Sequence, residues 1–399
     1  MSSNACRSLM LSRLTCVLAF VLLPLATGEL RAQTRSANTT EQFVLRVPAA
    51  LAEQVAARYG LTIIRQIEGQ DLFLVSRPAP ILSNSITSGA PDVASDAAVF
   101  NIEPNAAVVT PEVESPVLNG SPVSILDGLS DPQYLVSYFN NQVWSRYVDQ
   151  PATVAIGLAA SRQTGTGAGI VAIIDTGVDP HHPALAGSLV PGYDFIHETA
   201  GSASEWVDVD GSVVSILDGS VVSILDGHSV VTVNGSTVAI LDQATAAAID
   251  PALLPHAFGH GTMVAGLVHL VAPTAQIMPL KAFQADGTST VFDVVRAIYY
   301  AIDHGARVIN MSFSATSSSP EITRAIDVAT GRGIVCVASA GNLGHEMLVY
   351  PGALRNVLGI GSTSSTAPAI RSTFSNYGDA LVSLGAPGEA VVTTYPGGH

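Results

Sequence analysis

Five short apolar runs, each separated from the next by a longer stretch, dominate the second half of this 399-residue chain. They cover residues 170–174, 276–283, 307–312, 334–339 and 357–361. Residues 291–304 lie between two of them and repeat Val291, Val294, Val295 and Ile298 at spacings of three and four, which predicts a helix. Continuous apolar runs are typical of strands buried on both faces. Residues 131–399 are therefore predicted to form a three-layer α/β domain around a mostly parallel sheet.

The composition narrows the possible partners. With 48% hydrophobic and 12% charged residues, the chain can bury one large core and a smaller companion domain. Its formal charge of -15 would repel phosphate backbones and anionic membrane surfaces. We therefore expect no nucleic-acid partner.

The first 32 residues resemble an export signal. Arg7 and Arg13 precede an apolar run over residues 14–25, and a small-residue cleavage site could end at Ala32. A membrane anchor is the alternative, but the run is short for a span of about 20 residues. We expect a secreted protein that has no membrane contact after the signal is removed.

Removal of that signal would take Cys6 and Cys16 with it and leave Cys336 as the only cysteine. The mature chain could then form no internal disulfide. Because Cys336 lies within the apolar run 334–339, a buried and unreactive thiol is expected.

Residues 33–110 form a second predicted unit. Residues 43–47 alternate like a strand, Pro48 fits the first position of a helix that carries Leu51, Val55 and Tyr59, and Gly60 fits its end. Residues 61–67 and 72–75 are two further predicted strands. The pattern predicts a small α+β domain, which a linker over residues 111–130 joins to the main domain.

An eight-residue repeat interrupts the main domain within residues 205–245. Residues 211–242 contain GSVVSILD twice, then GHSVVTVN and GSTVAILD, with Asp-Gly or Asn-Gly at the junctions. Such dipeptides favour two-residue hairpin turns, so four short antiparallel strands are predicted. A fifth copy at residues 120–127 could pair along the edge of that sheet. A β-coil is the competing geometry, and a calcium-binding repeat fits poorly because each copy has at most one Asp.

Three short motifs follow predicted strands or begin a predicted helix. Asp175, in Ile-Asp-Thr-Gly, could orient an imidazole, or could simply cap a loop. His260, in Gly-His-Gly-Thr, precedes an apolar helical stretch that would hold an imidazole at its start, although a lone His is more often structural. Asn342, in Ser-Ala-Gly-Asn, could donate its amide to an oxyanion, or could be a turn residue.

The order Asp, His, Asn on one α/β domain resembles the subtilisin family, the subtilases. DTGVDPHHPAL, HGTMVAG, VINMSFS, ASAGN and STFSNYG with GAPG each match a segment of that family, over roughly residues 131–399. The resemblance implies a secreted serine endopeptidase that cleaves protein or peptide substrates through an acyl-enzyme, acting as a monomer. It implies Asp175 as orienting acid, His260 as general base and then acid, and Asn342 as oxyanion donor.

The resemblance also implies a substrate-binding strand and an inhibitor. Substrate would contact two segments, which are Ser312, Phe313 and Ser314, and Ala340 and Gly341. Ser314 stands where relatives often have Gly, so the shape of the specificity pocket is open. The segment 33–110 would be the propeptide, an intramolecular inhibitor and chaperone.

The chain departs from the family pattern in two respects. No Gly-Thr-Ser-x-Ala-x-Pro segment is present, so we expect the nucleophilic serine beyond residue 399 and an inactive fragment; Ser375 belongs to a different motif. The loop that carries a calcium site in many relatives is missing after the His260 helix, and Ala184 stands where a calcium-binding Asp often lies. No metal ligand or cofactor is assigned, and calcium at another site is left open.

Two other functions remain as alternatives. A degenerate protease scaffold could present the repeat sheet to a binding partner without catalysis. An aspartic protease built on Asp175 would need a second Asp-Thr-Gly or Asp-Ser-Gly segment, or a dimer, and would leave His260 and Asn342 without a role.

Overall fold

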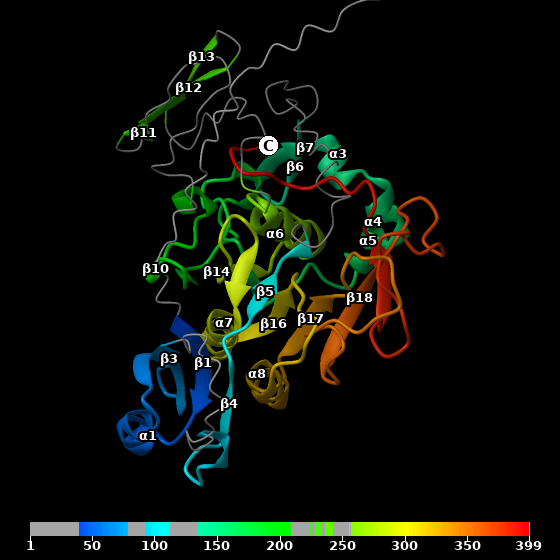
Figure 1. Cartoon of the computed structure of the whole chain (residues 1–399). Coiled ribbons are helices and arrows are strands. Elements are labelled where there is room, and N and C mark those ends of the chain that lie inside the picture. The colour runs from blue at the N-terminus through cyan, green and yellow to red at the C-terminus, as the bar shows by residue number, and fades with distance from the viewer. Residues whose placement is uncertain are drawn as a thin grey trace, which may run out of the picture. The chain divides into compact units, whose positions relative to one another are not determined.

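The computed structural model describes residues 40–78, 93–111, 135–208, 224–225, 228–233, 236–241, 255 and 257–398 (Figure 1). Residues Thr40–His399 belong to one compact unit. The predicted signal, the 120–127 repeat copy and the cleavage site near Ala32 lie outside the described residues. Among the described residues, no helix combines the length and apolar character needed to cross a membrane.

An eight-stranded sheet forms the centre of the main domain, in the order β10-β9-β14-β8-β16-β17-β18-β19. Its strands are β8 (Ile170–Asp175), β9 (Gly192–Asp194), β10 (Thr199–Gly201), β14 (Gln276–Lys281), β16 (Ala306–Met311), β17 (Val335–Ser339), β18 (Val357–Thr363) and β19 (Leu384–Pro387). All neighbouring pairs are parallel except β10 with β9. The predicted parallel sheet is confirmed, with each of the five apolar runs supplying one strand.

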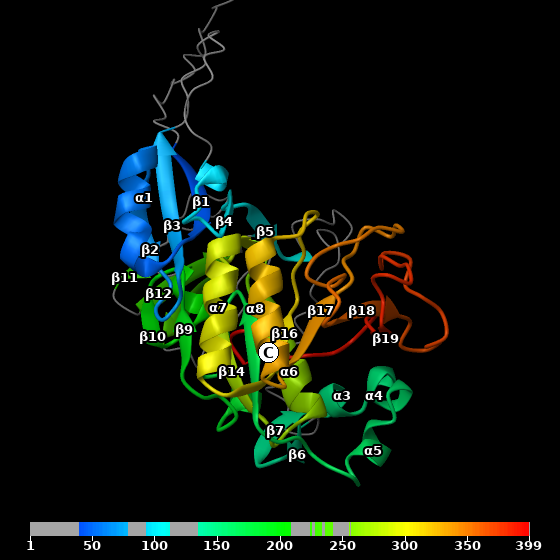
Figure 2. The same cartoon turned by 90° about the horizontal axis from the view of Figure 1, so that it is seen from below.

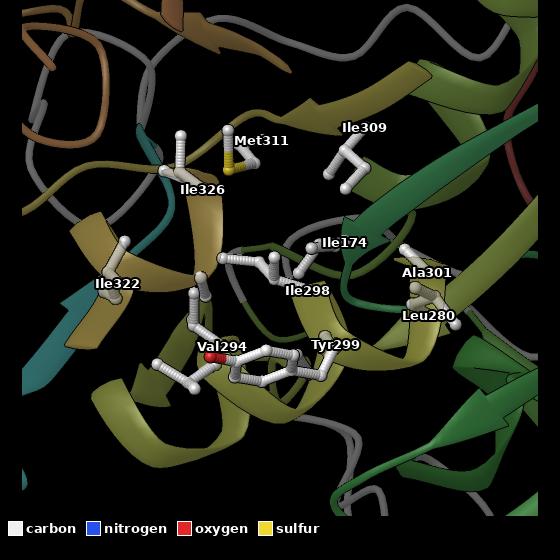
Figure 3. Packing of buried hydrophobic residues seen from close by; sticks show 14 of the residues in the cluster. Ile174, Leu280, Val294, Ile298, Tyr299, Ala301, Ile309, Met311, Ile322 and Ile326 are labelled. Atoms are coloured by element: carbon white, nitrogen blue, oxygen red, sulfur yellow. The ribbon is translucent and has the colours of Figure 1, made fainter. Parts of the chain in front are cut away.

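Helices pack against both faces of the sheet around β8, where alternate residues of the strand face different helices. Ile174 packs in the main core with α7 (Val291–Asp303) and α8 (Pro320–Gly331), which lie side by side in Figure 2. Figure 3 shows this layer, where Ile298 and Ile326 meet residues of β8, β14 and β16. Ile173, on the other face, packs with α6 (His260–Val271). The fold is thus the predicted three-layer arrangement.

The N-terminal segment has its own four-stranded sheet, in the order β2-β3-β1-β4, and its own core. It contains β1 (Thr40–Arg46), α1 (Ala52–Tyr59), β2 (Thr62–Gln66), β3 (Leu72–Pro78) and β4 (Asn101–Pro104). The helix begins later than predicted, because a single 3-10 turn, Ala49–Leu51, precedes it and Leu51 N donates to Pro48 O. Pro48 is therefore not the first residue of α1, and the Leu51 side chain is exposed. Gly60 ends the helix in the left-handed conformation, as predicted.

The remaining elements are short. β5 (Ala107–Val109) pairs with β15 (Thr288–Thr290), and β6 (Leu135–Tyr138) pairs with β7 (Asn141–Trp144). Helices α3 (Ser145–Val148), α4 (Pro151–Ala155) and α5 (Leu158–Ser161) follow, and 3-10 turns lie at Val93–Ser95, Pro183–Leu185 and Glu205–Asp208. The pairing of β5 with β15 was not foreseen from the sequence.

Three strands of the repeat are described, namely β11 (Ile224–Leu225), β12 (His228–Val233) and β13 (Ser236–Leu241). They pair antiparallel in sequence order, as the hairpin dipeptides predict. The first copy lies outside the described residues.

Candidate active site

Asp175 and His260 meet at the carboxyl end of the central sheet. Asp175 is the last residue of β8, and His260 is the first residue of α6. His260 Nδ1 lies 2.6 Å from Asp175 Oδ1. Both residues are buried, with exposed fractions of 8% for His260 and 1% for Asp175. Asp175 Oδ1 also accepts from Thr176 N at 2.7 Å. The backbone N–H groups of Ala282 and Phe283 both donate to the Asp175 carbonyl. The pairing of β14 with β8 therefore ends at Asp175.

Gly261 allows this close packing. A Cβ atom on Gly261 would lie 1.9 Å from the carbonyl oxygen of Gly177, a distance that no side chain can occupy. Only glycine therefore lets the first turn of α6 reach the loop that follows Asp175. This contact gives a physical reason for the Gly that follows His260 in the motif.

Glu205 is a buried residue of the site that the sequence analysis did not identify. Its carboxylate accepts from Thr176 Oγ1 at 2.7 Å, from Thr262 Oγ1 at 2.7 Å, and from the backbone N–H groups of Gly261 and Thr262 at 2.9 and 3.3 Å. Burial raises the pKa of Glu205 to about 7, and the two threonine hydroxyls act in the opposite direction. No sequence motif marks it, because it lies 55 residues before His260, across the repeat insertion.

Lys281 is a fully buried cation beside the pair. Its Nζ donates to the Thr176 carbonyl at 2.6 Å, to Asp208 Oδ2 at 2.7 Å and to the Phe283 carbonyl at 3.0 Å. These partners satisfy all three N–H groups of the ammonium. The ammonium therefore ties the loop after Asp175 to the turn Glu205–Asp208.

Asn342 lies at the same edge of the sheet as the pair, three residues after β17 ends at Ser339. Before it, Ala340 is buried and Gly341 has a φ of 83°, which favours glycine. A fully buried Asn376 holds this loop, because its backbone N–H donates to the Gly341 carbonyl and its Oδ1 accepts from Leu343 N at 3.0 Å. Asn342 and the Asp175–His260 pair thus share one edge, with no direct hydrogen bond described between them.

Ser312, Phe313 and Ser314 follow β16, two strands from β14. Ser312 Oγ accepts from Asn310 Nδ2, and Phe313 is buried with its ring 4.9 Å from that of Phe283. Ser314 exchanges two backbone hydrogen bonds with Val109, at 2.9 and 3.2 Å. The predicted substrate-binding strand is therefore paired with the end of the N-terminal segment of the same chain.

Ser375 does not belong to this constellation. Its Oγ donates to the Asn376 carbonyl and accepts from Ser362 N, and the side chain is buried. A hydroxyl with both roles filled by backbone partners is structural.

Metal ligands do not gather around the pair. In the part of the chain that the structure describes, no group of three or more His, Cys, Asp or Glu side chains is arranged to hold an ion. Ala184 is buried, and its carbonyl accepts from Asn141 Nδ2 at 3.0 Å.

The Asp-Thr-Gly motif also occurs in aspartic proteases, but the geometry of the Asp175–His260 pair favours general base catalysis by an imidazole. The hydrogen-bonding partner of Asp175 is an imidazole and not a second carboxylate. An aspartic protease would need two carboxylates to share a proton. An Asp–His pair instead fixes one ring nitrogen as a donor and leaves the other as a base.

Known proteins are similar to this chain in sequence and in fold. Thermitase of Thermoactinomyces vulgaris is 32% identical over 242 residues, which are 58% of this chain and 67% of thermitase. Subtilisin BL of Lederbergia lenta is 34% identical over 148 residues, 35% of this chain and 54% of that protein. The thermophilic serine proteinase of Bacillus sp. (strain AK1) is 28% identical over 293 residues, 70% of this chain and 59% of that proteinase.

Among solved structures, fervidolysin from Fervidobacterium pennivorans, a keratinolytic enzyme related to subtilisin, has a TM-score of 0.58 and 21% identity. The match covers 90% of this chain and 48% of fervidolysin, and it supports the fold alone. This chain therefore spans about half to two thirds of the length of these relatives. The model of the subtilase family matches residues 167–398, more than half of the chain. The chain belongs to the subtilase family, the subtilisin-like serine proteases.

Proposed function

We propose that this chain is the precursor of an exported serine endopeptidase in which Asp175 orients His260 and His260 acts as the general base. The observation that carries the proposal is the 2.6 Å hydrogen bond between two buried side chains at the sheet edge. With Nδ1–H held by the Asp175 carboxylate, Nε2 is the ring nitrogen that can take a proton. The carboxylate also stabilises the imidazolium that results.

In the reaction, a seryl hydroxyl attacks the carbonyl carbon of the scissile peptide bond while its proton passes to His260 Nε2. The tetrahedral intermediate collapses when His260 returns that proton to the leaving amine, which leaves an acyl-enzyme. Water then attacks the ester by the same route and releases the carboxylic acid. The Asn342 amide is proposed to donate to the oxyanion, a contribution of about 3 kcal/mol in comparable enzymes.

We propose that the attacking seryl hydroxyl comes from a segment beyond residue 399. An exposed apolar face of the central sheet supports this proposal, because it could be covered by such a segment. Val335, Leu358 and Leu384 share a face of β17, β18 and β19 and are 45%, 40% and 57% exposed. Their neighbours on the opposite face, such as Cys336, lie in the main core. Because parallel sheets are normally covered on both faces, a helix of the same protein is the expected cover.

The segment 33–110 is proposed to be the inhibitory propeptide. Its β5 lies between β15 and Ser314, in antiparallel register with both, and so occupies the strand position that an extended substrate would take. Thr110 N continues the pairing by donating to the Gly287 carbonyl at 2.9 Å. Cleavage near residue 110 would then be needed before a protein substrate could enter.

Two further contacts support a chaperone role for this segment. Glu103 Oε1 accepts from Glu321 N at 2.9 Å at the start of α8, and Asn105 Oδ1 accepts from Phe292 N at 2.9 Å at the start of α7. Helix N-termini expose N–H groups without partners of their own, so these caps stabilise both helices of one layer. Export and action as a monomer complete the proposal.

Hydrolysis of a general protein substrate tests the function directly. The chain should be produced with its downstream reading frame, and His260→Ala should lower turnover about 10⁴-fold or more. His304→Ala is the matched control, because His304 is exposed and, among the described residues, its ring contacts Tyr300 of the preceding helix, so this variant should retain full activity. Retained activity in His260→Ala would contradict the proposal, and a reading frame without a Gly-Thr-Ser segment would favour the binding scaffold instead.

A further inference from the structure

The turn Glu205–Asp208 is buried directly beside the Asp175–His260 pair. Glu205 is 1% exposed and accepts from two backbone N–H groups and two hydroxyls. These donors come from both sides of the pair. Thr176 follows Asp175 in the chain, and Gly261 and Thr262 follow His260.

One carboxylate therefore connects the end of β8 with the first turn of α6. Since His260 is the first residue of α6, the position of its imidazole depends on where that turn is held. Resting on the function proposed above, we propose that Glu205 is a positioning residue, which fixes the His260 ring against Asp175 by holding both backbones.

Two other hydrogen bonds join the same segments, and one of them is independent of Glu205, because Asp179 N donates to Thr262 Oγ1 at 2.8 Å. Thr176 Oγ1 also accepts from Gly261 N, at 3.1 Å, but that hydroxyl is itself bonded to Glu205. Without the carboxylate, Thr262 N would lose its acceptor, and the Thr262 hydroxyl would lose the acceptor of its own proton at 2.7 Å. The first turn of α6 would then be held to the loop after Asp175 by fewer hydrogen bonds, and the position of the His260 ring would be less well fixed.

The charges around Glu205 are consistent with this role. The positive end of the α6 dipole and the Lys281 ammonium favour its ionised form, while burial and the Asp175 carboxylate oppose it. Tyr395, from the C-terminal segment, also faces it, and the Glu205 charge adds to burial in raising the pKa of that phenol. Asp208, on the same turn, is neutralised by Lys281 at 2.7 Å.

Nuclear magnetic resonance of the full chain tests the proposal without any need for activity. The readouts are the solvent exchange rate of the His260 Nδ1 proton and the pH midpoint of the His260 ring titration. At about pH 8, where Glu205 with its pKa of about 7 is mostly ionised, we expect about tenfold faster exchange in Glu205→Gln, because the hydrogen bonds of a charged acceptor are lost. The pH midpoint of the His260 titration should fall in Glu205→Gln, because a nearby negative charge is removed and the alignment of the ring with Asp175 is weakened.

Glu321→Gln is the matched control. Glu321 is equally buried in the first turn of α8, but its carboxylate bonds Arg46 and Asn101. This variant should lose stability and leave both His260 readouts unchanged. Glu205→Asp, which keeps the charge but shortens the reach, should fold and give an intermediate change in exchange rate.

The outcomes separate the two proposals. If Glu205→Gln or Glu205→Asp loses stability while exchange and midpoint stay at the unsubstituted values, Glu205 is only structural and the inference is overturned. If the unsubstituted chain shows no hydrogen-bonded Nδ1 proton on His260, the proposed function fails and takes the inference with it.

Discussion

Asn376 is a fully buried amide whose side-chain and backbone contacts reach the loop that carries Asn342. Replacing it with alanine removes the acceptor of Leu343 N and His345 N. Asn376→Ala should therefore lower the free energy of unfolding by about 2 kcal/mol, measured by urea denaturation. Asn356→Ala, which removes only an exposed bond to Asp327, should change it by less than about 0.5 kcal/mol. Equal losses in the two variants would contradict the role given to Asn376.

Cys336 is a buried thiol that should be unreactive in the folded protein. Burial raises the pKa of its thiol to about 11, so almost none is ionised at about pH 8. Iodoacetamide at that pH should leave Cys336 unmodified in the folded protein and modify it fully in urea, as peptide mass spectrometry would show. Rapid modification of the folded protein would mean that the strand opens and that the thiol is accessible.

Single residues differ in how far the sequence reveals them. Asp175 and His260 each lie in a short continuous motif next to a predicted element, so their meeting could be predicted. Glu205 could not be found in this way, because its partners are distant in sequence. Thr176 lies 29 residues before it, and Gly261 and Thr262 lie 56 and 57 residues after it. Lys281 ends an apolar strand, where the sequence alone gives no sign of its buried partners.

The contacts between the N-terminal segment and the main domain can be tested at the scale of helices. Glu103 accepts from both Ser319 Oγ and Glu321 N at the start of α8. Glu103→Ala should lower the free energy of unfolding of the full chain by about 1 kcal/mol, which is typical of a lost helix cap. Glu68→Ala, at an exposed turn, is the control and should have little effect. If both variants unfold at the same urea concentration, the cap contributes nothing.

Strands and helices that repeat a simple pattern were the most predictable elements. The runs that became β8, β14, β16, β17 and β18 were found within one or two residues at most ends. The pairing of β5 with β15 was not, because each strand has only three residues and their partners lie far apart in sequence. The start of α1 was misplaced for a local reason, since Pro48 closes a 3-10 turn before the helix begins.

For the molecule as a whole, the buried Glu205 makes stability depend on pH. Burial raises its pKa from the ordinary value of 4.5 to about 7, so the native state binds more protons than the unfolded state between these values. The contribution of Glu205 to the free energy of unfolding is therefore full below about pH 4.5 and is lost as the pH rises through about 7. Urea denaturation at about pH 5 and about pH 7 should show a smaller decline in Glu205→Gln than in the unsubstituted chain. Parallel declines would mean that Glu205 keeps an ordinary pKa.

For the molecule as a whole, the central proposal is that the Asp175–His260 pair activates a seryl hydroxyl that lies beyond residue 399. Labelling with a fluorophosphonate, which reacts only with an activated seryl hydroxyl, tests it most directly on the chain produced with its downstream reading frame. We predict that a single serine beyond residue 399 is labelled, that His260→Ala abolishes labelling, and that His304→Ala leaves it unchanged. Labelling of the same serine at an equal rate in His260→Ala would contradict the account.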